Sequence, residues 1–269
     1  MHFPDWVNAI ILGIVEGLTE FLPVSSTGHL MVTGKWLGFD SEVFEVFIQI
    51  GALAAVWWLY RHRLLAMAPW NWSSNPAMKH LSWNVILAFL PAAVIGFATH
   101  HWIKEHLFTP QAIAWAFIVG GVVIVIVEWF KPLAVVEAVE GITPTLALAI
   151  GFGQCLALYP GVSRSGATIM TGLVLGLRRG VATEFTFLLA VPTMTAAALY
   201  ELVKYRHDLN SSMITLLVIG LVVSYISALL VVKWFIRFVQ GHTFNGFAAY
   251  RVVAGVVLLY FVSKGFFHP

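Results

Sequence analysis

Two glutamates four residues apart, Glu16 and Glu20, lie within an apolar stretch near the start of the chain. On a helix, residues at this spacing share one face, so the two carboxylates are expected to lie side by side. Two like charges in an apolar site cannot both remain ionised without a partner, which could be a divalent cation, an arginine or a shared proton. Paired carboxylates with open positions suit Mg²⁺ or Ca²⁺. The alternative is a structural pair that bonds to the backbone.

A hydroxyl-rich segment, Leu-Pro-Val-Ser-Ser-Thr-Gly-His at 22–29, follows the glutamates. Ser25, Ser26 and Thr27 open a half-helix there, and capping of its N-terminus is the simplest interpretation, above all for Ser25. Free N–H groups at such a helix start also bind phosphate, so all three residues are candidate phosphate ligands. Ser26 is in addition a candidate nucleophile, because His29 lies three residues further on and can act as a general acid or base.

A second segment of this kind, Tyr-Pro-Gly-Val-Ser-Arg-Ser-Gly at 159–166, contains Arg164. A guanidinium inside a membrane protein needs an anion, and its planar fork suits phosphate. We expect Arg164 to hold a phosphate and to stabilise the charge that develops during its transfer. The alternative is a salt bridge to a glutamate without substrate. Ser163, Ser165 and Thr168 repeat the hydroxyl arrangement and are further candidate phosphate ligands.

The composition places these residues in a lipid bilayer. Of 269 residues, 59% are hydrophobic and only 10% are charged, whereas soluble domains carry about 25% charged residues. The net charge of +2 gives no indication of nucleic acid binding. A single cysteine, Cys155, excludes an intrachain disulfide and zinc sites with several cysteines. The N-terminal stretch lacks a basic region, so we expect it to be retained rather than cleaved as a signal.

Eight apolar regions organise the chain. A spanning helix needs about 20 mostly apolar residues, and six stretches satisfy this, at roughly 43–60, 83–102, 112–130, 183–203, 213–236 and 247–266. Two further regions, 6–38 and 144–178, are interrupted by the hydroxyl-rich segments, and each half is short for a span. We predict an all-α polytopic membrane protein with six transmembrane helices and two re-entrant helical hairpins, whose turns are buried in protein or face a wet cavity.

The two interrupted regions match each other at an offset of 138 residues. Residues 25–28 align with 163–166, Glu16 with Gln154, Gly34 with Gly172, and Gly38 with Gly176. Each repeat is then a hairpin followed by three spans, over about 1–130 and about 144–269, within a single membrane domain 1–269. Three spanning helices carry the chain to the other side of the membrane, whereas a re-entrant hairpin returns it to the same side. The second repeat is therefore expected to be inverted, with the two hairpin turns meeting near the midplane.

The distribution of Lys and Arg orients the predicted helices. With the 61–82 loop in the cytoplasm, that side holds eight basic residues and the other side five. This bias places the first hairpin and both termini outside.

At these residues the chain resembles the undecaprenyl-diphosphate phosphatase family of bacteria, which is also known for bacitracin resistance. The matching stretches are Glu-Gly-Leu-Thr-Glu-Phe-Leu-Pro-Val-Ser-Ser-Thr-Gly-His at 16–29 and Pro-Gly-Val-Ser-Arg-Ser-Gly-Ala-Thr at 160–168. Two long motifs at this spacing are highly specific, and the similarity extends over essentially the whole chain.

The resemblance implies an enzyme that converts undecaprenyl diphosphate, the lipid carrier of cell-wall synthesis, to undecaprenyl phosphate and inorganic phosphate. It implies a requirement for Mg²⁺ or Ca²⁺ and a site that opens to the outer side of the bacterial cytoplasmic (inner) membrane. The site would be lined by Glu16, Glu20, Ser26, His29, Ser163, Arg164 and Thr168. Ser26, His29 and an activated water all remain open as the nucleophile. The sequence does not require a second copy, and a homodimer is compatible with it.

Two rival functions share some of these features. Inverted repeats and broken helices are typical of transporters, so a polyprenyl-phosphate or anion transporter, or a flippase, is the main alternative. A phosphatase of the phosphatidic-acid type would need a histidine five residues after the Ser163–Arg164 pair, where this chain has Met170. The dense hydroxyl, carboxylate and guanidinium chemistry favours the diphosphate phosphatase over both.

Overall fold

A computed structural model describes residues 3–39, 41–205 and 211–267, and these form helices and loops with one isolated β-bridge, between Val136 and Leu177. The α-helices are α1 (Asp5–Thr19), α2 (Ser26–Leu37), α3 (Glu42–Ala66), α4 (Pro76–His106), α5 (Pro110–Phe130), α6 (Pro144–Gln154), α7 (Arg164–Val174), α8 (Arg179–Lys204), α9 (Ser211–Gly241) and α10 (Asn245–Ser263). Three short 3₁₀ helices lie between them, η1 (Pro69–Asn71), η2 (Val139–Gly141) and η3 (Cys155–Leu158).

Six of these helices are long and apolar enough to cross a membrane. They span Glu42–Asn71, Pro76–His106, Pro110–Phe130, Arg179–Lys204, Met213–Gly241 and Asn245–Ser263. Each contains or overlaps one of the six predicted stretches, so the prediction of a six-span all-α membrane protein is confirmed. Helix α4, at Pro76–His106, extends beyond the predicted stretch 83–102 at both ends.

The helix ends follow from the local sequence. Side-chain oxygens of Ser41, Asn75, Thr109 and Thr143 accept hydrogen bonds from N–H groups in the first turns of α3, α4, α5 and α6. The last three of these helices also begin with proline, which has no N–H to satisfy there. At its C-terminus α2 ends on Gly38, whose φ of 66° is readily adopted only by glycine.

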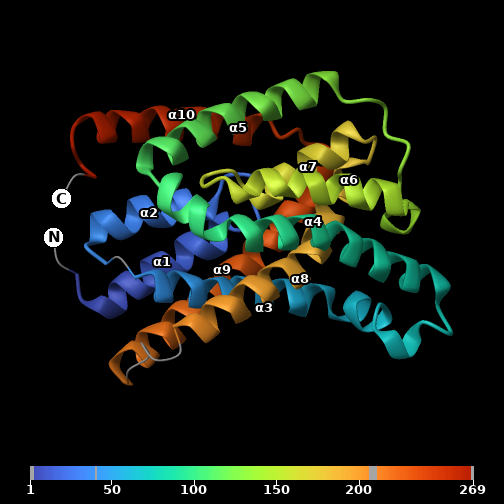
Figure 1. The fold of residues 1–269 in the computed structure, drawn as a ribbon, viewed down its shortest axis with the longest axis horizontal. Helices are drawn as coiled ribbons and strands as arrows, with labels where there is room; N and C mark the ends of the chain where they lie inside the picture. Colours follow the sequence, from blue (N-terminus) through green and yellow to red (C-terminus); the bar gives the residue numbers. More distant parts are fainter. Residues whose placement is uncertain (1–2, 40, 206–210, 268–269) are drawn as a thin grey trace.

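Two helical hairpins lie between the long helices. The first is α1 and α2, joined by the turn at 20–25, and the second is α6, η3 and α7, joined by the turn at 159–163. Figure 1 shows that they enter the bundle from opposite ends, with α1 beginning and α10 finishing at the same end. The two turns meet inside the molecule, because Ser163 and Ser165 both donate to the carbonyl oxygen of Leu22.

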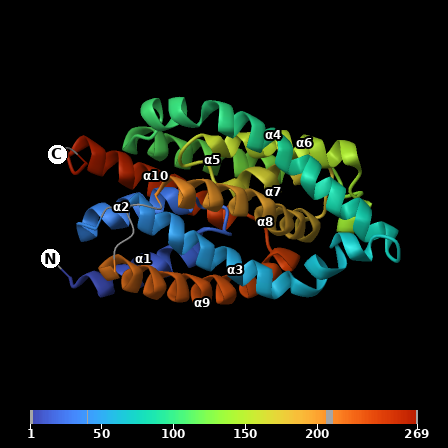
Figure 2. The ribbon, with the colours of Figure 1, turned by 60° about the horizontal axis from the view of Figure 1, so that its bottom comes forward.

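Each hairpin is held by a long helix that follows the other hairpin in the chain. Helix α1 packs against α9, as both ribbon views show (Figures 1 and 2), and α6 packs against α4. Glycines permit both contacts: a Cβ on Gly17 would lie 2.5 Å from the carbonyl oxygen of Ser224, and one on Gly151 would lie 2.5 Å from that of Ala88. Such close backbone approach is how helices associate in lipid.

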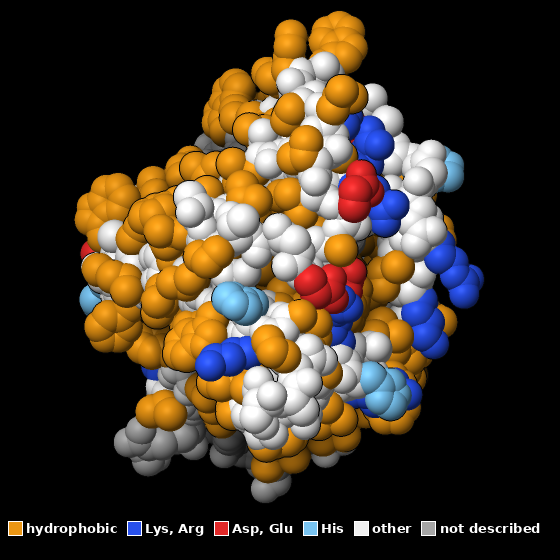
Figure 3. Space-filling view, turned by 90° about the vertical axis from the view of Figure 1, so that its right-hand side faces the viewer, with side chains coloured by type: hydrophobic (Ala, Val, Ile, Leu, Met, Phe, Trp, Pro, Cys, Tyr) orange, Lys and Arg blue, Asp and Glu red, His pale blue; other side chains and the backbone are white. Residues whose placement is uncertain are grey.

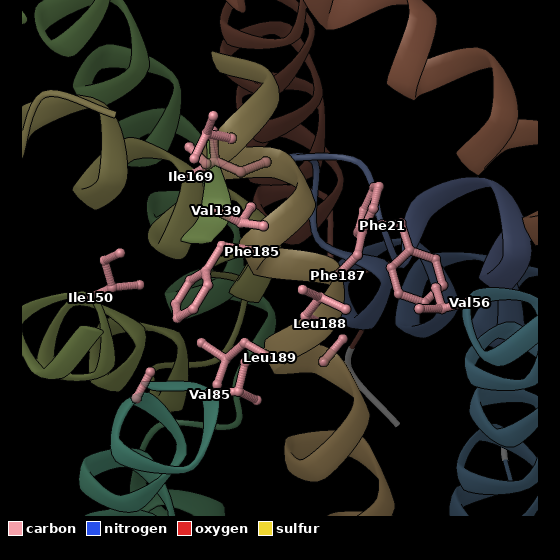
Figure 4. Close-up of a cluster of buried hydrophobic side chains, with 14 of the residues drawn as sticks. Phe21, Val56, Val85, Val139, Ile150, Ile169, Phe185, Phe187, Leu188 and Leu189 are labelled. Atoms are coloured by element: carbon pink, nitrogen blue, oxygen red, sulfur yellow. The ribbon is translucent and has the colours of Figure 1, made fainter. Parts of the chain in front are cut away.

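The hydrophobic core anchors the first turn. Phe21 is fully buried, and its ring meets Phe187 of α8 edge-to-face at a centroid distance of 5.6 Å. Figure 4 shows Phe21 between Phe187 and Val56 of α3, while Phe185 points towards Ile150 of α6 and Leu189 lies next to Val85 of α4. Helix α8 therefore sets the depth of the first turn in the bundle.

Candidate active site

Glu20 joins the two hairpins. Its Oε2 accepts a hydrogen bond from the hydroxyl of Ser26 at 2.5 Å, and its Oε1 accepts one from Nη2 of Arg164 at 3.0 Å. Both charged side chains are nearly buried, with 11% of the Glu20 side chain and 13% of the Arg164 side chain exposed. A hydroxyl that donates to a carboxylate can lose its proton to that carboxylate while it attacks an electrophile. The three residues are thus placed so that they could serve as a nucleophile, a base and an orienting cation.

Arg164 has an N–H donor that the described residues leave unpaired. Its Nη2 also lies 3.3 Å from the sulfur of Met194, and its guanidinium carbon lies 5.8 Å from the centroid of the Phe21 ring. Its Nη1 is buried and has no hydrogen-bond partner among the described residues. An orphaned guanidinium N–H in a low-dielectric site suits an anion such as a phosphate oxygen. A salt bridge to Glu20 and a bond to phosphate are therefore compatible, because Nη2 makes the first and Nη1 is available for the second.

Glu16 is fully buried, and both of its carboxylate oxygens lack a hydrogen-bond partner among the described residues. It lies one turn before Glu20 on α1. Two oxygens left unsatisfied in this way fit a hard cation, which prefers carboxylate and phosphate oxygens. No group of three or more His, Cys, Asp or Glu side chains in the described ranges is placed to hold a metal. A cation on Glu16 and Glu20 would therefore have to complete its coordination with substrate oxygens and water.

The hydroxyls of the second hairpin already have protein partners. Ser163 caps α7 by accepting from the N–H of Gly166 at 3.1 Å, and Ser165 donates to Leu22 of the first turn at 2.7 Å. Thr168 donates back into α7 and accepts from the hydroxyl of Thr186. Ser163 and Ser165 thus hold the two hairpins together, and Thr168 joins α7 to α8. A phosphate at this point would meet Arg164 and the N–H groups of the α7 start before it met these hydroxyls.

Ser25 does not cap α2 with its side chain, so that interpretation is wrong. It occupies the N-cap position with a φ of 71°, the one described residue other than glycine with a positive φ, and makes no side-chain capping bond. A turn of this kind costs about 1–3 kcal/mol and persists only where the surroundings hold it. Thr27 lies in the first turn of α2 and is half-buried. Phosphate binding by Ser25 and Thr27 stays a prediction.

His29 is not hydrogen-bonded to Ser26, since both of its ring nitrogens have other partners. Nδ1 donates to the carbonyl oxygen of Ser25 at 2.6 Å, and Nε2 lies 2.5 Å from the hydroxyl of Tyr250 on α10. The partner of Ser26 is Glu20 instead. A role for His29 as the direct base on Ser26 therefore has no support in this geometry, although the residue lies next to the turn.

Sequence reasoning missed Arg251, which ties the two turns together. It is 2% exposed, and its guanidinium donates to the carbonyl oxygens of Pro23 in the first turn and Gly161 in the second, at 3.2 and 3.1 Å. Further bonds reach Ala116 and Phe117 of α5. Gly120 leaves room for this side chain, because a Cβ there would lie 2.4 Å from Nη2 of Arg251. A charge near the start of the apolar 247–266 stretch, 13 residues before Lys264 near its end, was the signal that could have identified it.

A second charged region lies at the end of the molecule that is farther from the two chain termini (Figures 1 and 3). It lines a cavity of about 480 Å³ between the end of α3, the start of α8 and the loop that contains η2. Figure 3 shows acidic and basic side chains next to one another on this end. The pairs are Arg63 with Glu140 and Glu184, Arg178 with Glu137, and Arg179 with Glu128. Each of these cations therefore already has a carboxylate within salt-bridge distance.

Relatives of this chain are known across most of its length. Residues 9–257 match the family model described as "Bacitracin resistance protein BacA". A protein of Ectopseudomonas mendocina named undecaprenyl-diphosphatase is 48% identical over 255 residues, which cover 94% of this chain and 92% of that protein. One of Rhodospirillum rubrum, named undecaprenyl-diphosphatase 2, is 49% identical over 257 residues, with 94% and 93% covered. With matches of this identity and extent, the chain belongs to the bacitracin resistance protein BacA family.

Proposed function

We propose that this protein hydrolyses undecaprenyl diphosphate to undecaprenyl phosphate and inorganic phosphate, and so recycles the lipid carrier of cell-wall synthesis. The observation that carries the proposal is that one buried carboxylate, Glu20, accepts from a hydroxyl and from a guanidinium at the same time. This is the set of groups that a phosphoryl transfer needs. The names of the relatives, which are diphosphatases of this lipid, supply the identity of the substrate.

In the first step the hydroxyl oxygen of Ser26 forms a bond to the terminal phosphorus, and the bond from that phosphorus to the bridging oxygen breaks. The bridging oxygen leaves as part of undecaprenyl phosphate. Glu20 takes the Ser26 proton along the 2.5 Å hydrogen bond and passes it to the departing phosphate or to water. Arg164 stabilises the charge on the transferred group, and its Nη1, which has no hydrogen-bond partner among the described residues, is available to a phosphate oxygen.

In the second step a water molecule attacks the phosphoserine, and Glu20 accepts its proton. The bond between phosphorus and the Ser26 oxygen breaks, Glu20 returns the proton to Ser26, and inorganic phosphate leaves. Direct attack by water would invert the configuration at phosphorus, whereas this double displacement retains it. A cation on Glu16 and Glu20 would supply neutralisation of the diphosphate charge. The orphaned oxygens of Glu16 support this assignment of Mg²⁺ or Ca²⁺.

We further propose that both hairpins are re-entrant and that the chain is an inverted repeat. The packing supports this. In the repeat α1 corresponds to α6 and α9 corresponds to α4, and α1 packs against α9 just as α6 packs against α4. Gly38 and Gly176, which align in the repeat, both have left-handed φ values just after an outgoing half-helix. By the Lys/Arg bias, the first hairpin enters from the outer side of the cytoplasmic membrane, where the site would receive substrate.

The test is phosphate release from undecaprenyl diphosphate by the purified protein in detergent, with and without EDTA. Glu20→Gln and Arg164→Ala are assayed beside the wild type. Loss of phosphate release on EDTA treatment of the wild type and in both variants supports a metal-assisted phosphatase at the meeting point of the hairpins. No release by the folded wild type would exclude the enzyme and favour a transporter, because detergent abolishes transport but not hydrolysis. Release that survives both substitutions would place the site elsewhere.

A further inference from the structure

His29 links the exposed rim of the bundle to the turn before Ser26. On one side its imidazole bonds to the Ser25 carbonyl oxygen at 2.6 Å, and on the other it bonds to the Tyr250 hydroxyl at 2.5 Å. The rings of His29 and Tyr250 are also nearly parallel, with an interplanar angle of 7° and centroids 5.6 Å apart. The contact joins α2 to α10, residues 221 apart in the chain.

The partners determine the tautomer of His29. A carbonyl oxygen only accepts, so Nδ1 must carry the hydrogen in the bond to Ser25. In a neutral imidazole Nε2 is then the acceptor, and the Tyr250 hydroxyl is its donor. The hydrogen bonds therefore run in one direction, from Tyr250 through His29 to the Ser25 carbonyl. With Nε2 occupied in this way, the imidazole is locked in orientation as well as in tautomer.

The series of hydrogen bonds from Tyr250 through His29 ends at Ser25, the residue of the site with a strained backbone. Ser25 has a φ of 71°, a conformation that a serine adopts only when its surroundings hold it there. The next residue, Ser26, begins α2 and donates to Glu20. A relaxation of Ser25 would rotate the start of α2 and move the Ser26 hydroxyl away from the carboxylate. The bond from His29 opposes that relaxation.

We propose that Tyr250 is a positioning residue that acts through His29, holds the left-handed turn at Ser25 and thereby keeps Ser26 aligned on Glu20. The inference rests on the proposed function, since alignment of Ser26 matters only if Ser26 reacts. It assigns to His29 a task in the backbone geometry of the nucleophile rather than transfer of the Ser26 proton. It also explains why the rim of the site carries a tyrosine whose hydroxyl faces inward.

Tyr250→Phe tests this with little disturbance, because it removes the hydroxyl and keeps the ring that stacks on His29. The matched control is Tyr260→Phe on the same helix; both tyrosines are exposed, at 48% and 59%. We expect Tyr250→Phe to lower kcat about tenfold, which corresponds to about 1.4 kcal/mol, with KM changed less than twofold. Tyr260→Phe should leave both constants unchanged. A wild-type kcat in Tyr250→Phe, or a loss confined to KM, would overturn the inference.

A double-mutant cycle with His29→Asn separates positioning from a local packing effect. The asparagine amide can still donate to Ser25 but has no atom in the place of Nε2, so it cannot receive the tyrosine hydroxyl. If Tyr250 acts through His29, Tyr250→Phe should have no further effect in the His29→Asn background. Additive losses would overturn the proposal. Complete loss of turnover in folded His29→Asn would also overturn it, because His29 would then be needed for proton transfer.

The two proposals fail in different ways. If the wild-type protein releases no phosphate from undecaprenyl diphosphate, the proposed function itself is wrong. If the wild type is active and Tyr250→Phe matches Tyr260→Phe, only the positioning role is wrong. Thermal midpoints of the purified variants, measured in the same detergent, show that each comparison is made between folded proteins.

Discussion

The hydroxyl of Ser26 lies 2.5 Å from Oε2 of Glu20, six residues earlier in the chain and on the other arm of the same hairpin. The turn between α1 and α2 folds the motif back so that the hydroxyl and the carboxylate meet within one hairpin. The second hairpin adds the cation, through the 3.0 Å bond from Arg164 to Oε1, and its Ser163 and Ser165 hydroxyls donate to Leu22 of the turn. In the proposed mechanism the first motif therefore holds the reacting groups, and the second complements their charge.

Glu20→Gln should abolish most of the turnover while the fold is kept. Glutamine can accept a hydrogen bond from Ser26 but cannot take its proton, and loss of a positioned base costs about 10²–10⁴-fold. We expect kcat to fall within this range, measured as phosphate release from undecaprenyl diphosphate. Glu105→Gln, an exposed glutamate at the end of α4, is the control and should be neutral. A Glu20→Gln protein with more than a tenth of the wild-type kcat would exclude Glu20 as the base.

Arg164→Lys should retain the charge and still lose activity. A lysine has no planar fork, so it cannot bond Glu20 and a phosphate oxygen from separate nitrogens. Removal of one oriented donor to a transition-state oxyanion costs about 10²–10³-fold in kcat. Steady-state kinetics and a thermal melt on the same preparation would check this. Near-normal kcat would mean that the positive charge alone suffices and that the buried Nη1 has no catalytic part.

Glu16→Gln should weaken cation binding. If its two unpartnered oxygens hold Mg²⁺ or Ca²⁺, replacement of one of them and loss of the negative charge must raise the cation concentration needed for half-maximal activity. Outer-shell partners alone are worth about 10–100-fold in metal affinity, so we expect an increase of at least about tenfold. The wild type, treated with EDTA and without substrate, should also gain thermal stability on cation addition, and the variant should gain less. Identical cation titrations for both proteins would remove Glu16 from the metal site.

Gly120→Ala should loosen the site from a distance. The new methyl group would lie 2.4 Å from Nη2 of Arg251, so the guanidinium that joins the two turns must shift. Overpacking of this kind costs about 1–3 kcal/mol, and we expect a lower thermal midpoint together with lower kcat. Gly246→Ala is the matched control, because a Cβ there meets no atom within 4 Å. Equal melting of the two variants would show that Arg251 can move without consequence.

The long elements could be predicted because they depend on local properties. Length and hydropathy identify a spanning helix from consecutive residues, and all six predicted spans are present as helices. The pairing of Glu20 with Arg164 was also within reach, since a deep carboxylate and a deep guanidinium in one bilayer protein must find partners. These inferences use the cost of burying charge, which needs no knowledge of the three-dimensional arrangement.

Other parts of the site depend on contacts between distant segments and could not be predicted. Spacing placed His29 near Ser26, but its partner is Tyr250, which only the packing of α10 brings close. The side-chain capping expected of Ser25 failed because the turn adopts a positive φ that is held from outside. The charge of Arg251 was visible in the sequence, but its partners were not, because they are backbone carbonyls that no amino-acid type identifies.

The bonds from Arg251 and Tyr250 have a consequence for biosynthesis. Both residues belong to α10, which leaves the ribosome after every other helix described for this chain. Until α10 has entered the membrane, the carbonyls of Pro23 and Gly161 lack their shared donor and His29 lacks its tyrosine. The nascent protein can therefore insert its nine earlier described helices without a finished active site. On the proposed function, a chain stalled before α10 should therefore release no phosphate, because the bonds from α10 that hold the two turns are not yet made.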